Sequence, residues 1–413
     1  PLRRNSGFRM LWIGQVLSDT GTNAALIAYP LLILALTHSP ALAGVVGTLR
    51  LVVQLLLGLP GGAVSDRLDR RLTMIACDSV RAVVLVGLGV LVLMHLASWQ
   101  VVLVIALVDG AANVLFDPAA TGALPVIVAD EQLEQAWAAS EGRSYAASLA
   151  GPAIGGALFG LGSAIPFLGD AVSYLVSAGT VSRIRGKFRP ERTAEKKSLW
   201  HETFDGIRLV WRAPLLRAVV IQAPLINFAF TGAIFTVTLA LRRHGTAAGI
   251  VGLVQAGISV GGLAGAILAP RMQGRLSLSR LVVGMTAGAT VLFAVGAWLL
   301  PSTLVALPLA ITLLAAPTAN AALFAAMLRV TPADMRGRVS STVLMCATGL
   351  AALAPLAAGL LVEHLSGTWA MYFFAAFIGI ATIMSATLPG LRNAEATLPQ
   401  PAGDDEATAP AAG

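Results

Sequence analysis

Eight ionisable side chains interrupt the apolar stretches of the first 182 residues, and their types suit proton binding and ion pairing. If these stretches cross a bilayer, each such group costs about 2.5–3.5 kcal/mol at the centre, so it marks an ion pair, a proton path or a substrate site. The cores of the later apolar stretches contain no ionisable residue. We therefore expect any proton chemistry to belong to the first half. The eight residues are Asp19, Arg50, Asp78, Arg81, Asp109, Glu141, Arg143 and Asp170.

Three polar stripes recur at helical spacing in this half. Gln15, Asp19 and Asn23 follow one another at intervals of four, which places them on one face of a helix. The other two stripes are Asp109, Asn113 and Asp117, and Glu141, Tyr145 and Ser148. Stripes of this kind indicate helix faces turned towards water, so we expect them to line half of a central cavity.

Two interpretations of the cavity acids remain open. In the first, one acid carries a proton across the membrane, with Asp19 and Asp109 preferred over Glu141. In the second, each acid only forms a structural ion pair, with partners drawn from Arg50, Arg81 and Arg143.

Depth along the helices favours particular pairs. At a rise of 1.5 Å per residue, Asp19 lies roughly 16 Å from one membrane side and Arg50 roughly 14 Å from the other, so the two can pair. Arg81 follows Asp78 by three residues, which predicts a local pair within one helix.

The composition predicts the elements that must position these residues. The 413 residues are 56% hydrophobic and 12% charged, with a mean hydropathy of +0.79. Soluble proteins carry about a quarter charged residues. Because a helix needs roughly 20 apolar residues to cross a bilayer, we expect an all-α integral membrane protein with twelve transmembrane helices. The spans are expected at 9–36, 41–63, 73–95, 99–122, 137–160, 164–182, 215–241, 247–270, 281–300, 303–328, 339–362 and 367–389.

Six spans lie on each side of a basic stretch, which predicts two pseudo-symmetric six-helix bundles. Apolar residues at helical spacing over 198–212 predict a helix along the membrane surface. The first apolar segment is expected to remain as a membrane helix. The expected domains are an N-terminal bundle (1–182), a cytoplasmic basic linker (183–214), a C-terminal bundle (215–390) and a disordered tail (391–413).

Lys and Arg are distributed unevenly between the two sides. Of the 28, 23 lie near the termini and in alternate loops, whereas the opposite loops contain only Arg242 and Arg243. Such an excess marks the cytoplasmic side. Both termini are therefore expected in the cytoplasm, with the chain in a bacterial cytoplasmic (inner) membrane.

The two halves resemble each other at an offset near 203 residues. GPAIGGALFG (151–160) aligns with APLAAGLLVE (354–363), which places Pro152 against Pro355. A repeat with six spans in each copy is typical of transporters built from two related bundles.

A charged loop between the second and third spans carries a family resemblance. PGGAVSDRLDRRL (60–72) resembles the G-x-x-x-D-R-x-G-R-R/K motif of the major facilitator superfamily, with Asp69 at the usual glycine. The segments 8–21, 116–138 and 151–156 are similar to the branch that includes macrolide and enterobactin exporters. The resemblance covers about residues 8–390 and implies alternating access between two bundles. The loop residues that match are Gly62, Asp66, Arg67, Arg70 and Arg71.

The resemblance implies a gating role for this loop. Asp66 is expected to face the N-terminus of span eleven, where a carboxylate meets the positive end of a helix dipole, worth about 0.3–1 kcal/mol when exposed. Arg70 is expected to pair with Asp117 at the end of span four. These contacts would hold the bundles together while the cavity is open outward. The alternative is a solvated loop that only follows the positive-inside rule.

The segment GPAIGG also has two interpretations. It is similar to the core of the antiporter motif of proton-coupled drug exporters, through Gly151, Pro152, Gly155 and Gly156. Alternatively, Gly151 and Gly155 form a G-x-x-x-G pair that lets two helices approach closely.

These features predict a multi-pass exporter of an amphipathic small organic molecule, a drug or secondary metabolite, by proton antiport. The C-terminal cavity face is expected to be uncharged and partly aromatic, which suits such a molecule better than a sugar. The alternatives are an uncoupled or import facilitator for a metabolite or lipid, and a membrane sensor or scaffold.

Several classes of activity lack the residues they need. The sequence contains no phosphate-binding G-x-x-x-x-G-K-[S/T] segment and no H-E-x-x-H pair. Cys77 and Cys346 both lie inside apolar runs, which suggests neither a disulfide nor a metal site. We expect no enzyme activity, cofactor, metal or nucleic-acid partner. The expected partners are a small-molecule substrate, protons and the lipid bilayer, with the chain acting as a monomer.

Overall fold

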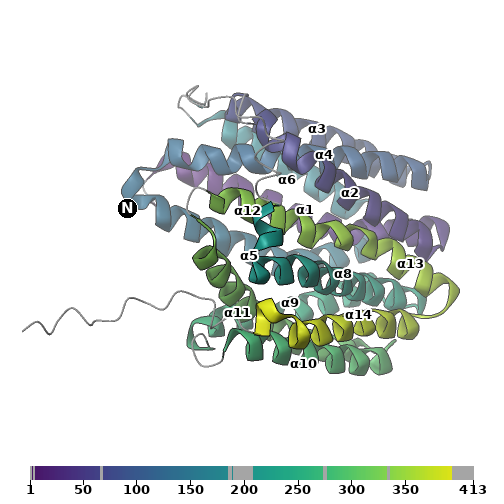
Figure 1. The fold of residues 1–413 in the computed structure, drawn as a ribbon. Coiled ribbons are helices and arrows are strands. Elements are labelled where there is room, and N and C mark those ends of the chain that lie inside the picture. Colours follow the sequence, from purple (N-terminus) through teal and green to yellow (C-terminus); the bar gives the residue numbers. More distant parts are fainter. Residues whose placement is uncertain are drawn as a thin grey trace, which may run out of the picture.

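The computed structural model describes residue 2 and residues 5–65, 68–184, 188, 208–272, 277–332 and 335–392. Within these ranges the regular structure is helical, and no strand is formed. Figure 1 shows most of the helices running along one common direction. They form two six-span bundles, which confirms the predicted all-α architecture.

The first bundle consists of six helices joined by short turns. Before the first helix, the Asn5 side chain accepts a hydrogen bond from the Phe8 N–H group at 3.0 Å. Before the third, Asp69 accepts from the Arg71 and Leu72 N–H groups at 3.0 and 3.1 Å. The residue at the usual glycine of the loop motif therefore caps a helix. The helices are α1 (Ser6–Thr37), α2 (Pro40–Ser65), α3 (Arg70–Leu93), α4 (Trp99–Ile127), α5 (Asp130–Leu161) and α6 (Ile165–Ser182).

The order of packing decides which polar faces meet in this bundle. Helix α1 packs against α5 and α6, whereas α4 packs against α2 and α3. Helix α3 also packs against α6. The arrangement brings side chains of α1, α3, α4 and α5 around one space.

The second bundle repeats this plan with an interrupted eleventh span. Pro355 lies at the start of α13, a position that tolerates proline because the N–H group there has no partner within the helix. The elements are α8 (Pro214–Arg243), α9 (Ala248–Met272), α10 (Leu278–Leu299), η2 (Thr303–Val305), α11 (Ala306–Val330), α12 (Arg336–Gly349), η4 (Leu350–Leu353), α13 (Ala354–His364), α14 (Gly367–Thr387) and α15 (Pro389–Arg392).

The helices are suited to a bilayer. In the described part of the chain, eleven helical segments are long and apolar enough to cross a membrane, with α12, η4 and α13 acting together as one. Helix α6, with 18 residues, completes the first bundle. The total agrees with the twelve predicted spans, and the chain is a multi-pass membrane protein.

Two helices extend further than their apolar cores predict. Helix α4 continues to Ile127 instead of ending near 122, and α5 begins at Asp130 instead of 137. Asp130 and Glu131 occupy the first turn of α5, where negative charge is favourable. Hydropathy locates the part of a helix inside the membrane, not the helix ends.

The bundles approach each other closely at the end that holds the α1–α2 and α13–α14 connections (Figure 1). Gly156 of α5 lies against Gly252 of α9, and Gly44 of α2 lies against Pro355 of α13. A Cβ atom at any of these three glycines would collide with the backbone of the facing helix. The N-terminus lies at the opposite end of the molecule (Figure 1).

Several sequence predictions lie outside the described residues. They concern Asp66 and Arg67, residues 189–207 of the linker and the tail from 393. Gly62 belongs to helix α2, and residues 208–212 are helical just before α8.

Candidate functional site

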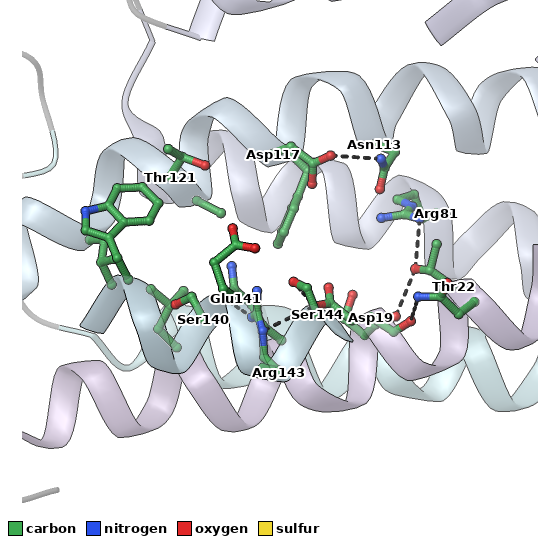
Figure 2. A pocket seen from close by; sticks show the side chains of 18 residues that line it. Asp19, Thr22, Arg81, Asn113, Asp117, Thr121, Ser140, Glu141, Arg143 and Ser144 are labelled. Carbon is green, nitrogen blue, oxygen red and sulfur yellow. Dashed lines mark hydrogen bonds and ion pairs between the residues drawn. The ribbon is translucent and has the colours of Figure 1, made fainter. Parts of the chain in front are cut away.

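A cavity of about 350 Å³ lies among the helices of the first bundle. Its walls come from α1, α3, α4 and α5, and Figure 2 shows their polar side chains around it. Arg50 and Asp109 do not belong to its lining. Six of the predicted stripe residues line the cavity, namely Gln15, Asp19, Asn23, Asn113, Asp117 and Glu141.

Asp19 is held by an ion pair at the cavity wall. Its Oδ2 atom lies 3.2 Å from Nε of Arg143 on α5, and the Ser144 hydroxyl donates to the same oxygen at 3.4 Å. Arg143 also donates to the side chain of Gln15, and Asn23 donates to the backbone carbonyl of Asp19 at 2.8 Å. The Asp19 side chain keeps 28% of its surface exposed. It is therefore paired and still accessible from the cavity.

Two further acids line the cavity. Asp117 of α4 accepts a hydrogen bond from Asn113 at 3.1 Å, and Glu141 of α5 is exposed (Figure 2). Neither forms an ion pair among the described residues. Trp137 lines the same space, so the cavity combines charged, polar and aromatic surfaces.

A buried charge network lies behind the cavity. Asp109 of α4 accepts from Nε of Arg81 on α3 at 2.8 Å and from Nη2 of Arg50 on α2 at 3.1 Å. The Arg81 guanidinium stacks on the Tyr174 ring of α6, 4.0 Å from its centroid, and donates to Thr22 of α1 at 3.3 Å. Both Asp109 and Arg81 are buried. The network therefore joins five of the six helices, and it reaches the cavity wall at Arg81 and Thr22.

The predicted Asp19–Arg50 pair is wrong. Helix α2 packs on α4, and α5 packs on α1. Each therefore bonds to a side chain on its own neighbouring helix, which is Asp109 for Arg50 and Arg143 for Asp19.

The predicted local pair between Asp78 and Arg81 is also wrong. The guanidinium of Arg81 turns towards Asp109 and the Tyr174 ring, which together provide an anion and an aromatic face. Asp78 remains without an ion pair among the described residues.

Two arginines of the loop motif begin α3 and bind backbone carbonyls of other helices. Arg70 donates to the Gly122 carbonyl of α4 at 2.7 Å, and Arg71 donates to the Ser182 carbonyl at the end of α6. The Arg70–Asp117 pair is not formed in this arrangement, in which Asp117 bonds to Asn113. The resemblance implies this pair while the cavity is open outward, so it stays a prediction.

The glycines of GPAIGG contact two different helices. Gly151 and Gly155 face Asn23 and Ala24 of α1, and Gly156 faces α9 of the second bundle. The carbonyl of Pro152 approaches α9 at Gly252. The segment therefore packs α5 against both bundles, as the close-packing interpretation predicts, and the antiporter role stays a prediction.

The sequence as a whole matches a family model described as transmembrane secretion effector, over residues 1–404. The chain therefore belongs to the transmembrane secretion effector family of the major facilitator superfamily. Solved structures agree with this fold. A bacterial homologue of the lysosomal transporter Spinster, in an inward-facing form, has a TM-score of 0.73 at 15% identity over 97% of this chain and 99% of that one. A mutant of the nucleoside transporter NupG has a TM-score of 0.78 at 12% identity, over 92% and 99% of the two chains.

Curated relatives of this chain include exporters. The multidrug efflux pump Tap of Mycolicibacterium fortuitum is 27% identical over 271 residues, which are 60% of this chain and 63% of Tap. The match thus spans just under two thirds of that relative. The enterobactin exporter EntS of Citrobacter koseri is 24% identical over 292 residues, 70% of this chain and 68% of EntS.

Some residues that line the cavity were not predicted from the sequence patterns. Trp137 precedes Glu141 by four residues and Ser140 precedes Ser144 by four, so the four lie towards one side of the helix. Both residues lie at the start of the predicted span 137–160, and their spacing from Glu141 and Ser144 was a usable signal. The role of Arg81 had no local signal, because its partner lies on another helix.

Proposed function

We propose that this transporter exports an amphipathic small organic molecule, a drug or secondary metabolite, in exchange for protons. The observation that carries the proposal is the partly exposed Asp19–Arg143 ion pair in a cavity of the first bundle. The names of Tap, a multidrug efflux pump, and EntS, an enterobactin exporter, support the direction of transport.

The cavity has the size and surface of a small-molecule site. Its volume of about 350 Å³ falls in the range of roughly 300–1,000 Å³ that is usual for ligand pockets. Leu11, Phe116 and Trp137 provide apolar contacts, and Glu141 and Arg143 provide charge. An amphipathic molecule satisfies both kinds of surface.

Among the acids, Asp19 is the best-placed proton carrier. Asp109 is enclosed by two arginines and is only 1% exposed, so it exchanges poorly with water. Asp19 has one ion pair and reaches the cavity. A proton on Asp19 removes the charge that holds Arg143, which weakens the contact between α1 and α5. Substrate and proton then compete for the same wall of the cavity, as exchange requires.

The orientation is part of the proposal. The distribution of Lys and Arg favours cytoplasmic termini in a bacterial inner membrane. The close contacts between bundles lie at the end away from the N-terminus, so this form is open to the cytoplasm. We assign 1–182 and 215–390 to the two moving bundles, 183–214 to the linker and 391–413 to a tail, within a monomer.

Proton flux in proteoliposomes tests the proposal. A pH dye trapped inside reports proton movement when each member of a panel of lipophilic drugs is added. Wild type is compared with Asp19→Asn, Asp109→Asn and Glu141→Gln. Glu141→Gln is the matched control, because it neutralises an acid that lines the same cavity.

Each outcome has a definite meaning. Drug-dependent flux that is lost in Asp19→Asn and kept in Glu141→Gln supports antiport through Asp19. Loss in Asp109→Asn, with the protein folded and Asp19→Asn active, moves the carrier to α4. If labelled substrate equilibrates without proton movement, antiport is rejected and an uncoupled facilitator is the function.

A further inference from the structure

Asp78 is a buried acid that the proposed transport cycle has not used. It lies on α3 with 0% of its surface exposed, and neither carboxyl oxygen has a hydrogen-bond partner among the described residues. The Ser177 hydroxyl of α6 faces it outside hydrogen-bond geometry and also lacks a partner. An ionised carboxylate in such a place is strongly disfavoured, because nothing replaces the water it has lost.

The natural partner of Asp78 is turned away from it. Arg81 lies three residues later, on the same face of α3, which is the spacing of a helix ion pair. In this form the Arg81 guanidinium instead bonds to Asp109 and stacks on Tyr174. Arg81 is therefore close enough along α3 to form an ion pair with Asp78, but in this form it does not.

The buried charges of the first bundle do not balance. Asp109 is the one acid of this interior that has ion pairs among the described residues, and it binds both arginines. Asp170 accepts from the Ser173 hydroxyl at 3.1 Å through one oxygen, while Asp78 accepts from no group. Asp78 is thus the more isolated acid. The buried set contains two bases, Arg50 and Arg81, and three acids, Asp78, Asp109 and Asp170.

We infer that Asp78 is a second proton-binding site, which holds a proton in this form and releases it when Arg81 moves from Asp109 to Asp78. The proton leaves a carboxyl oxygen of Asp78 for the water of the cavity, which Arg81 also lines. The ion pair Arg81–Asp78 replaces the pair Arg81–Asp109, and Arg50 remains on Asp109. The role of Asp78 in a transport cycle rests on the proposed function. The presence of a proton on Asp78 in this form does not.

The groups around Asp78 are consistent with a switch centred on Arg81. Helix α3 packs against α4 and α6 and bonds to α1 through Arg81 and Thr22. Besides Asp78, the charged and titratable groups of these elements are Arg9, Asp19 and Tyr29 of α1, Arg70, Arg71, Cys77 and Arg81 of α3, Asp109 and Asp117 of α4, and Asp170 and Tyr174 of α6. Arg81 is the cation among them that lies one helical turn from Asp78 on the same helix.

Infrared spectroscopy tests the proton directly. The full chain is reconstituted in liposomes without substrate, and the carbonyl stretch of a protonated, buried carboxylic acid is recorded before and after exchange into heavy water. We expect a band that shifts on exchange and is lost in Asp78→Asn. Asp170→Asn is the matched control, because it removes another buried acid from the same bundle, and the band should persist there.

A band that survives in Asp78→Asn, or that disappears in Asp170→Asn instead, overturns the inference. Asp78→Glu serves if the Asn variant does not fold: it keeps an acid, so the band must persist at a shifted position, and its absence also overturns the inference. Because the infrared measurement uses no substrate, it tests the proton on Asp78 even if no drug-dependent proton flux is found. Where antiport is established, Asp78→Asn should lower the number of protons moved per substrate by one, and an unchanged ratio overturns the coupling role.

Discussion

Access to water divides the charged side chains of the first bundle into two groups. Asp19 and Arg143 line the cavity and are partly exposed, whereas Arg50, Arg81 and Asp109 are buried, with only Arg81 of these three at the cavity wall. Removing one member of a buried ion pair leaves an uncompensated charge, which destabilises a protein much more than removing an exposed charge does. The buried network should therefore hold the bundle together, and the cavity pair should be free to act in transport.

Asp109→Asn should lower the free energy of unfolding by about 3–5 kcal/mol, because Arg50 and Arg81 would stay buried without their acid. Asp19→Asn should lower it far less, since its side chain is 28% exposed. Thermal unfolding of the purified variants in detergent compares them. Equal unfolding temperatures for the two would contradict the structural role of Asp109.

The sequence predicted which acids share the first bundle but not how they pair. Helical spacing placed Asp19 and Asp117 on polar faces, and both line the cavity. The pairs depend on which helices are neighbours, and several acids lie at similar depths. Arg50 and Arg81 meet at Asp109 because α4 packs between α2 and α3, a fact that no local pattern contains.

Helices α2 and α13 cap each other across the contact between the bundles. The Ala41 N–H group and the Ser39 hydroxyl, at the start of α2, both donate to Glu363 of α13, at 2.8 and 2.5 Å. The Leu356 N–H group, near the start of α13, donates to Thr48 of α2 at 3.0 Å. Each helix thus satisfies N–H groups that its partner cannot satisfy itself.

Glu363→Ala combined with Thr48→Val should loosen this end of the molecule. Losing a helix cap costs about 0.5–2 kcal/mol, which shifts the equilibrium between open and closed forms about twofold to thirtyfold. Leu96 and Leu304 are exposed and lie on different bundles, so spin labels at Leu96→Cys and Leu304→Cys report the distance between the bundles. Cys77 and Cys346 are first replaced so that only these two sites are labelled. An unchanged distance distribution would show that the caps do not hold the closed form.

Gly156→Ala should hinder closure of the same end. Its Cβ would lie 2.8 Å from the Cα atom of Gly252, and such overpacking costs about 1–3 kcal/mol, so transport should fall about fivefold or more. Gly160→Ala, one turn later on α5, is the control, because its nearest neighbour would be 3.9 Å away. Uptake into inverted vesicles compares the two variants, and equal rates would contradict the role of the close contact.

Span lengths were predictable because the apolar cores have sharp edges. Helix α6 matches the predicted span closely, whereas α5 begins at Asp130, seven residues early. The polar turns before 137 stand outside the apolar core and are stabilised by capping charges and by packing. The run of apolar residues therefore predicts only the part of each helix that a bilayer would cover.

The whole molecule keeps the symmetry that its sequence repeat predicts. Pro152 of α5 approaches Gly252 of α9, and its counterpart Pro355 of α13 approaches Gly44 of α2. The two contacts between bundles are therefore copies of one helix pair. The charges are not copied, since the buried ion pairs of the described residues all belong to the first half.

Reporter fusions should show both termini in the cytoplasm. A fluorescent protein fused to the C-terminus should fluoresce, and alkaline phosphatase inserted at Gly245, between α8 and α9, should be active outside. A phosphatase fusion at Ala129, between α4 and α5, is the control and should be inactive. The opposite pattern would invert the membrane orientation and with it the direction in which this form is open.

Trp137 gives the cavity an optical signal of its own. Its indole lies in the wall beside Glu141, so a molecule that enters the cavity changes the polarity around the ring. The difference in emission between wild type and Trp137→Phe isolates this ring from the other six tryptophans. A drug that binds in the cavity should quench or shift that difference signal in a saturable way, without a label or a pH gradient. Binding can then be followed separately from transport.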